Sequence, residues 1–557
     1  MRANNFLLAF AVFRLAPTAC FAQKPAVCHI GQHDHEYKMT VMAAPPLRTG
    51  LGSTTLKMTT QSERAQQYFQ QGVSLLHCFW DFEAYRAFKE AARLDPNAAM
   101  AYWGIVQSIT SYKAMEDEKK TALDKVKELL DKASDHEQYY LRGLQKQEEK
   151  DGHEEFAGEM EALIVKYPED LDAKLFLAIN SDYGYDKDGR PHKGAPYSLM
   201  LVENVLASHP QNAAANHYFI HVLEPGPFAE RARHAADVLA ALAPASGHMV
   251  HMPGHIYYKL GDQELARHSF LASMRVDREY MTAENVSTDD DWNYAHNLSY
   301  LIASDAEAGR YKEALEMAGK LDQLPANPFL AKGRPTHATT VGSAAMRLQL
   351  RFSNWQEAID HPVSVGDEKL AGPAAIGFRD AMAAYARGMQ ALDRKQFDKA
   401  AQQADALDAL QWRLKSEQLD EKDKIERVFG LLQTASLDLR GNLKCLQGDR
   451  EGGYSMLRKA IEEEKQVGYA EPPQYSRPEL ESLGYAYLGG GEYDKARQAF
   501  QDELALRPKS GHALYGIALS YEQAGKKQDA HEAYVQFLDA WKSADPDLPM
   551  MAHARSK

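Results

Sequence analysis

Cysteine is scarce in this chain, and so are the other features that mark several common classes of protein. Four cysteines occur in 557 residues, and removal of Cys20 with a leader would leave an odd number, which makes no disulfide framework. Beyond the N-terminus, no stretch has the roughly 20 continuous apolar residues that span a bilayer. The net charge is −14 and no Lys/Arg-rich run reverses it locally, so nucleic acid is not an expected partner.

Motifs of the common enzyme classes are also missing. The sequence has no phosphate-binding GxxxxGK[ST] motif, no GxSxG nucleophile elbow and no dinucleotide fingerprint. We therefore expect no nucleotide cofactor. His217 and His221 are spaced like the two ligands of HExxH, but Tyr218 stands where that motif has its general-base glutamate. This substitution disfavours a zincin-like protease, and the sequence leaves open whether the protein is an enzyme.

Residues 1–22 are typical of a secretory signal peptide. Arg2 precedes an apolar run, and small residues precede a cleavage point after Ala22. The predicted location is therefore the periplasm or the outside of the cell. The alternative is a buried N-terminal helix, because Arg14 shortens the apolar run. A lipid anchor on Cys20 is not expected, since the preceding PTA makes a poor lipoprotein box.

The segment CHIGQHDHE, which begins at Cys28, has no apolar periodicity. A Cys/His-rich tract can bind metal, but the same segment also resembles a polar tail, and both interpretations stay open. Its histidines are His29, His33 and His35. Cys78 and Cys445 have apolar neighbours and are expected to be core thiols.

An internal repeat organises most of the remaining chain. Gly491, Ala496 and Phe500 recur 34 residues later as Gly525, Ala530 and Tyr534. This period, with small and aromatic residues at these offsets, is the tetratricopeptide (TPR) pattern of paired antiparallel helices. We therefore predict an all-α TPR solenoid, with a possible division into two sub-arrays at the Pro/Gly-rich region near residues 366–377. The predicted segments are a signal peptide (1–22), a polar Cys/His-containing segment (23–60), an N-terminal array (61–365), a C-terminal array (374–545) and a tail (546–557).

Six histidines fall into register with this repeat. Pro210 and Pro244 are 34 residues apart and end the helix pairs that precede two successive repeats. Counted from the residue three after each proline, the histidines occupy positions 2, 5 and 9 of first helices. These positions form one stripe of an α-helix, and in TPR arrays this stripe lines the concave groove. The residues are His217 and His251 at position 5, His221 and His255 at position 9, and His248 and His296 at position 2.

This stripe predicts a transition-metal site. Imidazoles that reach inward from neighbouring helices can meet one ion, and a histidine-rich centre suits Cu, Zn, Fe or Ni better than Mg or Ca. Three nearby polar residues are candidates for a supporting role, namely Glu224, Tyr258 and Asn297. Glu224 could instead be a carboxylate ligand. The alternative is a metal-free groove in which the histidines form hydrogen bonds to a peptide or pack against neighbours.

Pro253 lies between two of these histidines. Inside a helix a proline costs about 3 kcal/mol, and such exceptions are commoner at functional sites. If a helix instead begins at Pro253, His248 and His251 lie on a loop and the stripe is partly wrong. Gly254 is the small residue that TPR packing requires at its position.

The segments NHYFIHVLEP, GHMVHMPGHIYYKLGD and AHNLSYL together resemble a widespread, mostly uncharacterised family of bacterial TPR proteins. That family has recurring NHYxIH, GHxxHMPxHIY and HN elements, and the resemblance covers residues 65 to 540. It implies that the six histidines and Asn297 occupy motif positions. Ser299 departs from the pattern, because the family usually has a second histidine there. The resemblance brings no established reaction.

Two functions therefore follow from the sequence. The first is an exported TPR protein that holds a transition metal in a histidine-lined groove and uses it catalytically if a coordination position stays open. The second is a metal-free scaffold that binds a protein or peptide partner. Because metal ligation needs neutral imidazole, metal affinity is expected to fall below about pH 6.5, whereas a peptide held by cationic histidines would bind better there.

Overall fold

A computed structural model describes residues 42–110, 115–288, 291–324, 341–365, 371–416, 426–473 and 477–557. Within these ranges the fold is all-α, and the one β-type contact is an isolated bridge between Tyr185 and Pro191. None of the described helices combines the length and apolar character needed to cross a bilayer. The predicted fold class, an array of TPR-type helix pairs, is confirmed.

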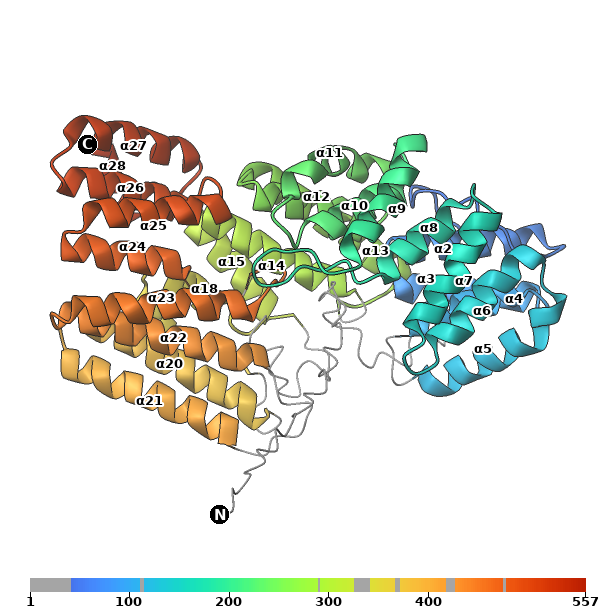
Figure 1. Cartoon of the computed structure of the whole chain (residues 1–557), viewed down its shortest axis with the longest axis horizontal. Helices are drawn as coiled ribbons and strands as arrows, with labels where there is room; N and C mark the ends of the chain where they lie inside the picture. The colour runs from blue at the N-terminus through green and yellow to red at the C-terminus, as the bar shows by residue number, and fades with distance from the viewer. Residues whose placement is uncertain are drawn as a thin grey trace, which may run out of the picture.

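The helices follow one another along the chain as antiparallel neighbours (Figure 1). The first part contains α2 (Glu63–His77), α3 (Asp81–Leu94), α4 (Ala99–Ile109), α5 (Glu116–Leu129), η2 (Leu130–Lys132), α6 (Asp135–Gln147), α7 (His153–Lys166), α8 (Leu171–Asn180) and α9 (Ala195–Ser208). The middle contains α10 (Ala213–Leu223), η3 (Ala229–Ala232), α11 (Arg233–Leu242), α12 (Gly247–Lys259), α13 (Gln263–Glu284), α14 (Trp292–Glu307), α15 (Tyr311–Asp322), α18 (Ala344–Arg351) and α19 (Trp355–Asp360). The last part contains α20 (Pro373–Asp393), α21 (Phe397–Ser416), α22 (Glu426–Leu446), α23 (Arg450–Val467), α24 (Glu479–Gly490), α25 (Tyr493–Leu506), α26 (Gly511–Gln523), α27 (Lys527–Ala540) and α28 (Pro549–Arg555).

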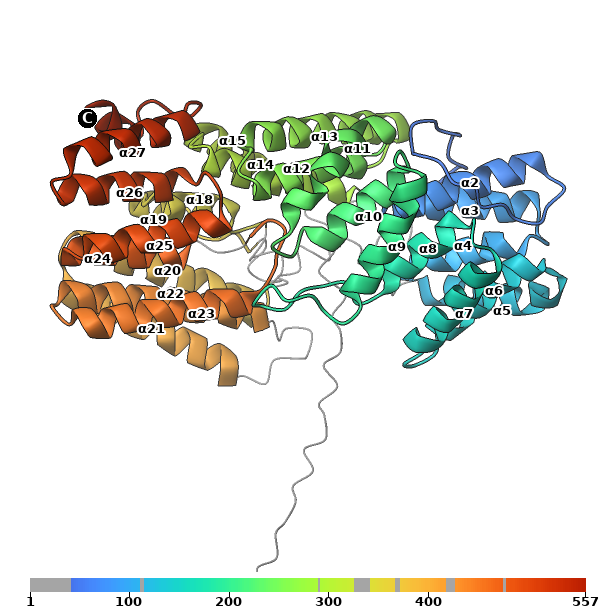
Figure 2. The ribbon, with the colours of Figure 1, turned by 45° about the horizontal axis from the view of Figure 1, so that its top comes forward.

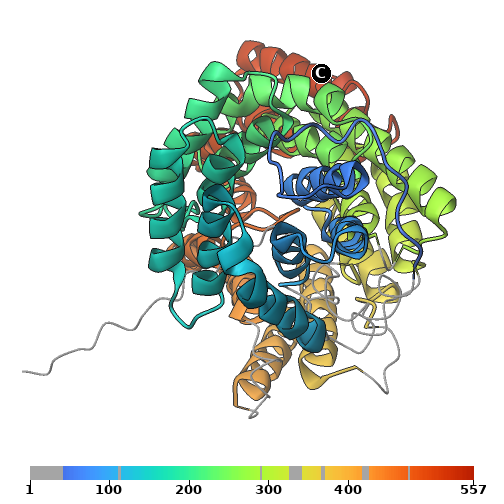
Figure 3. The same ribbon diagram turned by 90° about the vertical axis from the view of Figure 1, so that its right-hand side faces the viewer.

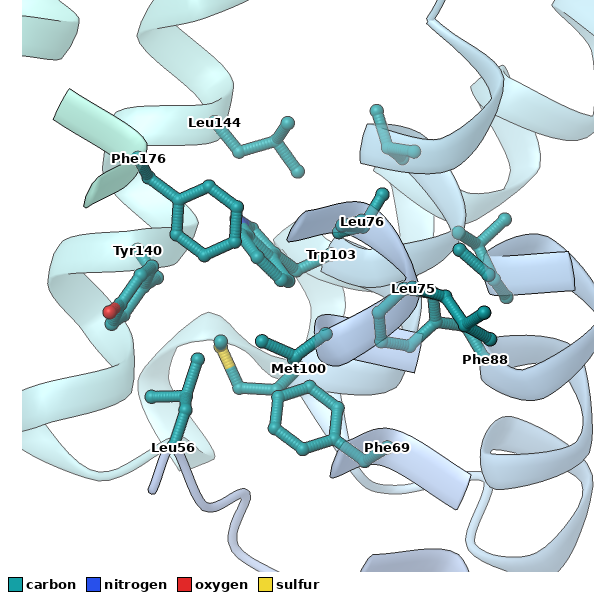
Figure 4. Packing of buried hydrophobic residues seen from close by; sticks show 14 of the residues in the cluster. Leu56, Phe69, Leu75, Leu76, Phe88, Met100, Trp103, Tyr140, Leu144 and Phe176 are labelled. Atoms are coloured by element: carbon teal, nitrogen blue, oxygen red, sulfur yellow. The ribbon is translucent and has the colours of Figure 1, made fainter. Parts of the chain in front are cut away.

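Small residues of the repeat let aromatic rings fill the space between helices. The Phe88 ring in α3 lies where a Cβ on Gly72 in α2 or on Gly104 in α4 would collide with it, at 2.6 and 2.3 Å. The same arrangement recurs at Phe270 with Gly254, and at Phe500 with Gly484 and Gly516. The glycine next to Pro253 is thus a packing residue, as predicted. Figure 4 shows Phe88 in the N-terminal core beside Phe69 and Trp103.

The helices that carry the histidine stripe lie in the middle of the array. In Figures 1 and 2, α10, α12 and α14 lie between the N-terminal helices and the stack from α24 to α28. α12 packs against α10, α11, α13 and α14. In the view along the long axis, the repeats follow a curved path (Figure 3). This curvature brings segments that are distant in sequence towards the central helices.

The C-terminal helices pack back onto the middle of the array. The Trp541 indole N–H donates to the Glu307 carbonyl at 2.9 Å, and the Arg351 guanidinium pairs with the Glu481 carboxylate, where both side chains are buried. Helix contacts also continue from α15 through α18 and α19 to α20. The two predicted sub-arrays therefore touch along a second interface as well as following one another in sequence.

The described part of the N-terminal segment lies against the array. The Gly50 carbonyl accepts from the Ala245 N–H at 2.9 Å, and the Thr54 hydroxyl donates to Asp172 at 2.9 Å. Leu51 and Leu56 are buried. The predicted signal peptide, Cys20 and the segment with Cys28, His29, His33 and His35 lie outside the described residues. Of the two predicted core thiols, Cys78 is buried and Cys445 is half-buried.

Asn212 begins the first of the site helices. Its side chain accepts a hydrogen bond from the Ala215 N–H at 2.8 Å and so satisfies one of the free donors of α10. Asn212→Ala is expected to lower the free energy of unfolding by about 1 kcal/mol, measured by urea denaturation. Asn212→Ser, which keeps a capping oxygen, should stay within a few tenths of a kcal/mol of the wild type. Equal destabilisation by both variants would contradict this role.

Candidate metal centre

Three first helices bring the six predicted histidines together. α10 supplies His217 and His221, α12 supplies His248, His251 and His255, and α14 supplies His296. α12 is helical on both sides of Pro253, so the predicted stripe is continuous and the loop alternative is wrong. The expectation of an open groove is also wrong at this point, because none of the six side chains is more than 4% exposed. Neighbouring aromatic and acidic residues cover the stripe.

The first trio consists of His217, His221 and His248. The Nε2 atom of His217 lies 2.9 Å from Nε2 of His221 and 3.0 Å from Nε2 of His248. For metal–nitrogen bonds of about 2.0–2.1 Å, ligand nitrogens at angles between 90° and tetrahedral lie about 2.9–3.4 Å apart. The separations in the first trio therefore match those of a metal site.

The second trio consists of His251, His255 and His296. One ligand nitrogen from each lies within 4.8 Å of the others. The Nε2 atoms of His251 and His255 are in direct contact. The His296 ring is 4.7 Å from the His251 ring, measured between centroids. Within the described part of the chain, these two trios and a group of Glu224, His255 and Glu471 have the spacing of metal ligands.

Hydrogen-bond acceptors next to Nδ1 of three rings, on the side away from the cluster, fix which nitrogen carries the proton. Nδ1–H of His217 donates to the His77 carbonyl at 2.7 Å, and Nδ1–H of His255 donates to Glu224 at 2.7 Å. Nδ1–H of His251 donates to the Asn297 side-chain oxygen at 2.5 Å. In a neutral imidazole, a protonated Nδ1 leaves the lone pair on Nε2. The lone pairs of all three rings therefore point into the cluster.

Hydrogen bonds hold the Asn297 side chain with its amide oxygen toward His251. Its Nδ2 donates to Ser273 Oγ at 2.6 Å and to Asp277 Oδ2 at 3.0 Å. With the amide nitrogen used in this way, the amide oxygen faces His251. Burial and the nearby Asp291 raise the pKa of Asp277 well above its usual range. The predicted supporting role of Asn297 thus has a structural basis, a chain of hydrogen bonds from α13 through α14 to α12.

The cluster fits a cation better than it fits neutral rings alone. His251 and His255 both use Nδ1 as a donor, so two Nε2 lone pairs face each other in contact. Such lone pairs repel unless a proton or a metal ion lies between them. Moreover, the His217 lone pair faces two other Nε2 atoms and can accept a hydrogen bond from only one. A metal ion satisfies all three nitrogens of a trio together.

Most of these imidazoles are neutral near pH 7. Burial lowers the pKa of His217 to about 3. Burial, and repulsion from the other rings, also hold the pKa values of His248, His251 and His296 well below their usual range. His255 differs, because the Glu224 carboxylate outweighs the effect of burial and raises its pKa. Neutral imidazole is the form that binds metal.

Glu224 is the acidic residue closest to the trios. It is buried and accepts from His255 and from the Tyr469 hydroxyl through Oε1. Its other oxygen, Oε2, is also buried and has no hydrogen-bond partner among the described residues. The Glu471 carboxylate lies 3.9 Å from both His255 Nδ1 and His296 Nε2. These two carboxylates supply negative charge that would offset a buried cation.

Aromatic residues enclose the two trios. The Phe79 ring centroid lies 4.7 Å from that of His217. The Phe79 backbone has φ +53°, in the left-handed region that non-glycine residues rarely adopt. Trp292 contacts one ring of each trio, at 5.2 Å from His248 and 5.7 Å from His296. Tyr300 packs on His255 at 4.1 Å. The ligands are thereby shielded from bulk water.

A cavity of about 720 Å³ lies beside the second trio. Tyr300 and Tyr469, which touch His255 and Glu224, also form part of its wall. The predicted supporting residue Tyr258 lines this cavity and packs edge-on against Tyr300 at 5.7 Å, one ring further from the histidines than expected. Basic side chains from distant segments line the same cavity. They are Lys187, Lys259, Arg347, Lys465, Arg477 and Arg507, and acidic side chains line the cavity as well, namely Asp186, Asp188, Glu230, Glu307, Glu464 and Glu479.

Several residues of the site have no signal in the sequence. His77 is the last residue of α2, whereas Phe79, Tyr469 and Glu471 lie in connections, and only the folded chain brings all four to the stripe. Ser299, which departs from the family pattern, donates to the Ala295 carbonyl of its own helix at 3.1 Å. Both trios are complete without a ligand at that position. His234 and His268 are exposed and belong to neither trio.

No protein-family model matches the sequence, and no curated protein is similar to it. Among solved structures, the chain is similar to a human IFIT1 dimer with m7Gppp-AAAA, at 12% identity and a TM-score of 0.31, over 88% of this chain and 92% of that one. It is also similar to the APC/C hetero-tetramer Cut9-Hcn1, at 15% identity and a TM-score of 0.30, over 88% and 75% of the two chains. Similarities of this size do not identify a ligand. The fold assignment rests on the helix pairs themselves, and the likeness to the bacterial TPR family remains a resemblance in motifs.

Proposed function

We propose that this protein binds a transition metal in the buried cluster of six histidines. The observation that carries the proposal is the orientation of the rings: acceptors hold Nδ1–H of His217, His251 and His255 outward, and the Nε2 lone pairs converge. Such outer hydrogen bonds commonly fix the tautomer of metal-bound histidine. Nitrogen-rich ligand sets favour Zn, Cu, Fe or Ni over Mg and Ca.

A metal held by three histidines keeps a coordination position open for water or a substrate. The cavity beside Tyr300 and Tyr469 is of a size that takes a small molecule or a short peptide segment. Its wall touches both His255 and Glu224. We therefore propose that the bound metal is used on a ligand that enters this cavity, by hydrolytic or redox chemistry.

A metal-free scaffold is the second candidate, and the same cavity supports it. Its wall carries both basic and acidic side chains, and Arg507 is paired with Glu464 and Glu503, so it would suit a polar peptide or the tail of a partner protein. The histidines themselves do not favour this function, because buried rings with low pKa values offer no cationic surface to a peptide. Peptide binding would then depend on the cavity arginines and would persist after the histidines are replaced.

Metal content provides the first test. Elemental mass spectrometry of the purified, tag-free protein is expected to find at least one transition-metal ion per chain before mild chelation. The double variant His217→Ala/His251→Ala removes one ligand from each trio and should contain none. His268→Ala, which replaces an exposed histidine outside the site, is the matched control and should keep the wild-type content.

Absence of metal from the wild-type protein, with a thermal midpoint that Zn²⁺ and Cu²⁺ leave unchanged, would overturn the proposal. Any ligand that binds only the folded state must raise its stability, by about 2.7 kcal/mol at a hundredfold excess over Kd.

We also propose, from residues 1–22 alone, that the protein is exported from the cell, which N-terminal sequencing of the mature chain would check.

A further inference from the structure

The two histidine trios are built in the same way by successive repeats. His217 and His221, one turn apart in α10, correspond to His251 and His255, which lie 34 residues later in α12. Each pair is completed by a histidine at position 2 of the next first helix. These completing residues are His248 in α12 and His296 in α14. The repeat of the fold is therefore also a repeat of the ligand set.

The trios are adjacent but distinct. α12 contributes His248 to one and His251 to the other, and the centroids of these two rings are 6.0 Å apart. Within each trio the ligand atoms lie within 4.8 Å of one another, which suits one ion. Ligands of one ion with bonds of about 2.0–2.1 Å lie within about 4.2 Å of one another, and among the described residues no group joins the two trios even within 4.8 Å. The six imidazoles are therefore more ligands than one ion can bind at this spacing.

We propose that each trio holds its own metal ion, so that the protein carries a pair of ions at repeat-related sites. This inference rests on the proposed function. The ring of Trp292, which contacts both trios, lies at the boundary between the two sites.

The two sites differ in charge. Glu224 and Glu471 belong to the second trio, whereas a backbone carbonyl and the Phe79 ring contact the first. A dication is better compensated beside two carboxylates, and the first ion to bind then repels a second one nearby. Binding is therefore stepwise. The second trio, His251, His255 and His296, fills first, and the first trio fills at higher metal concentration.

Native mass spectrometry during titration of the metal-free protein with Zn²⁺ tests this arrangement. The wild type should pass through a species with one zinc and reach two zinc ions per chain. His221→Ala should stop at one and keep the tighter step. His296→Ala should also stop at one but keep only the weaker step. His268→Ala serves as the control, and circular dichroism confirms that each variant is folded.

The outcomes separate this inference from the proposed function. One zinc per wild-type chain, lost in both variants, would overturn the paired sites and leave a single metal site standing. A second zinc that persists when either trio is broken would also overturn them, because it would bind elsewhere. No zinc on the wild-type protein would overturn both proposals. The wild-type stoichiometry decides the matter even if a variant fails to fold.

Discussion

Acidification of the metal-free protein is expected to remove stability through its buried histidines, starting at an unusually high pH. The pKa of His217 is lowered to about 3 in the folded state, against about 6.5 for an unperturbed histidine. As the pH falls below 6.5, the unfolded chain binds a proton that the folded protein does not. Linkage then lowers the free energy of unfolding by about 1.4 kcal/mol per pH unit, or about 3 kcal/mol between pH 7 and 4, for this residue alone.

The other buried groups with shifted pKa values determine how much the free energy of unfolding changes with pH. The lowered pKa values of His248, His251 and His296 act in the same direction as that of His217. His255 acts in the opposite direction, because a raised pKa gives stability that is fully present below 6.5 and is lost as the pH rises. Buried carboxyl groups whose pKa values are raised, among them Asp277 and Glu503, gain stability as the pH falls and so oppose the lowered histidines. The contribution of a single histidine is therefore read from the difference between variants.

Urea denaturation of chelated protein at pH 7, 6 and 5 measures this dependence. The window from pH 6.5 to 5 is informative because ordinary carboxylates stay ionised there. His217→Asn removes one titrating ring and should reduce the slope by about 1.4 kcal/mol per pH unit, whereas His268→Asn at the surface should leave the slope unchanged. Equal slopes for the wild type and His217→Asn would contradict the neutral, buried state of the His217 ring.

The arrangement of the histidines was predictable because it follows from local periodicity. The 34-residue repeat and the positions 2, 5 and 9 fix which face of α10, α12 and α14 each ring occupies. Pro253 is tolerated within α12 because the surrounding packing holds that helix, with Phe270 filling the space over Gly254. Local sequence therefore sufficed to place the six histidines on one stripe and Glu224 beside an imidazole.

The residues that enclose the site were not predictable from any local pattern. Tyr469 and Glu471 follow α23 and reach Glu224 and the second trio only because the curved array brings its C-terminal part back to the middle. Phe79 lies on the connection between α2 and α3, where a single aromatic residue carries no signal. The prediction of an open groove failed for this reason. A stripe that faces solvent in an isolated repeat becomes buried once distant connections pack over it.

Glu224→Gln is expected to weaken metal binding at the second trio by about 10-fold to 100-fold, the usual effect of losing an outer hydrogen-bonding partner of a ligand. The substitution keeps the shape of the side chain but removes its charge. His255 then loses the carboxylate that orients it and makes its ring more basic. A zinc titration followed by calorimetry gives the change in Kd, and Glu203→Gln, which alters a surface ion pair with Arg231, is the matched control.

The direction of this change distinguishes two roles for the carboxylate. If Glu224 only compensates a protonated His255 in a metal-free protein, its replacement lowers the pKa of His255, frees the lone pair and leaves metal affinity equal or higher. If it supports a metal ligand, affinity falls even at pH 8, where proton competition at His255 is weak. The second role is favoured by Oε2, which is buried and has no hydrogen-bond partner among the described residues, an arrangement that a nearby metal ion would stabilise.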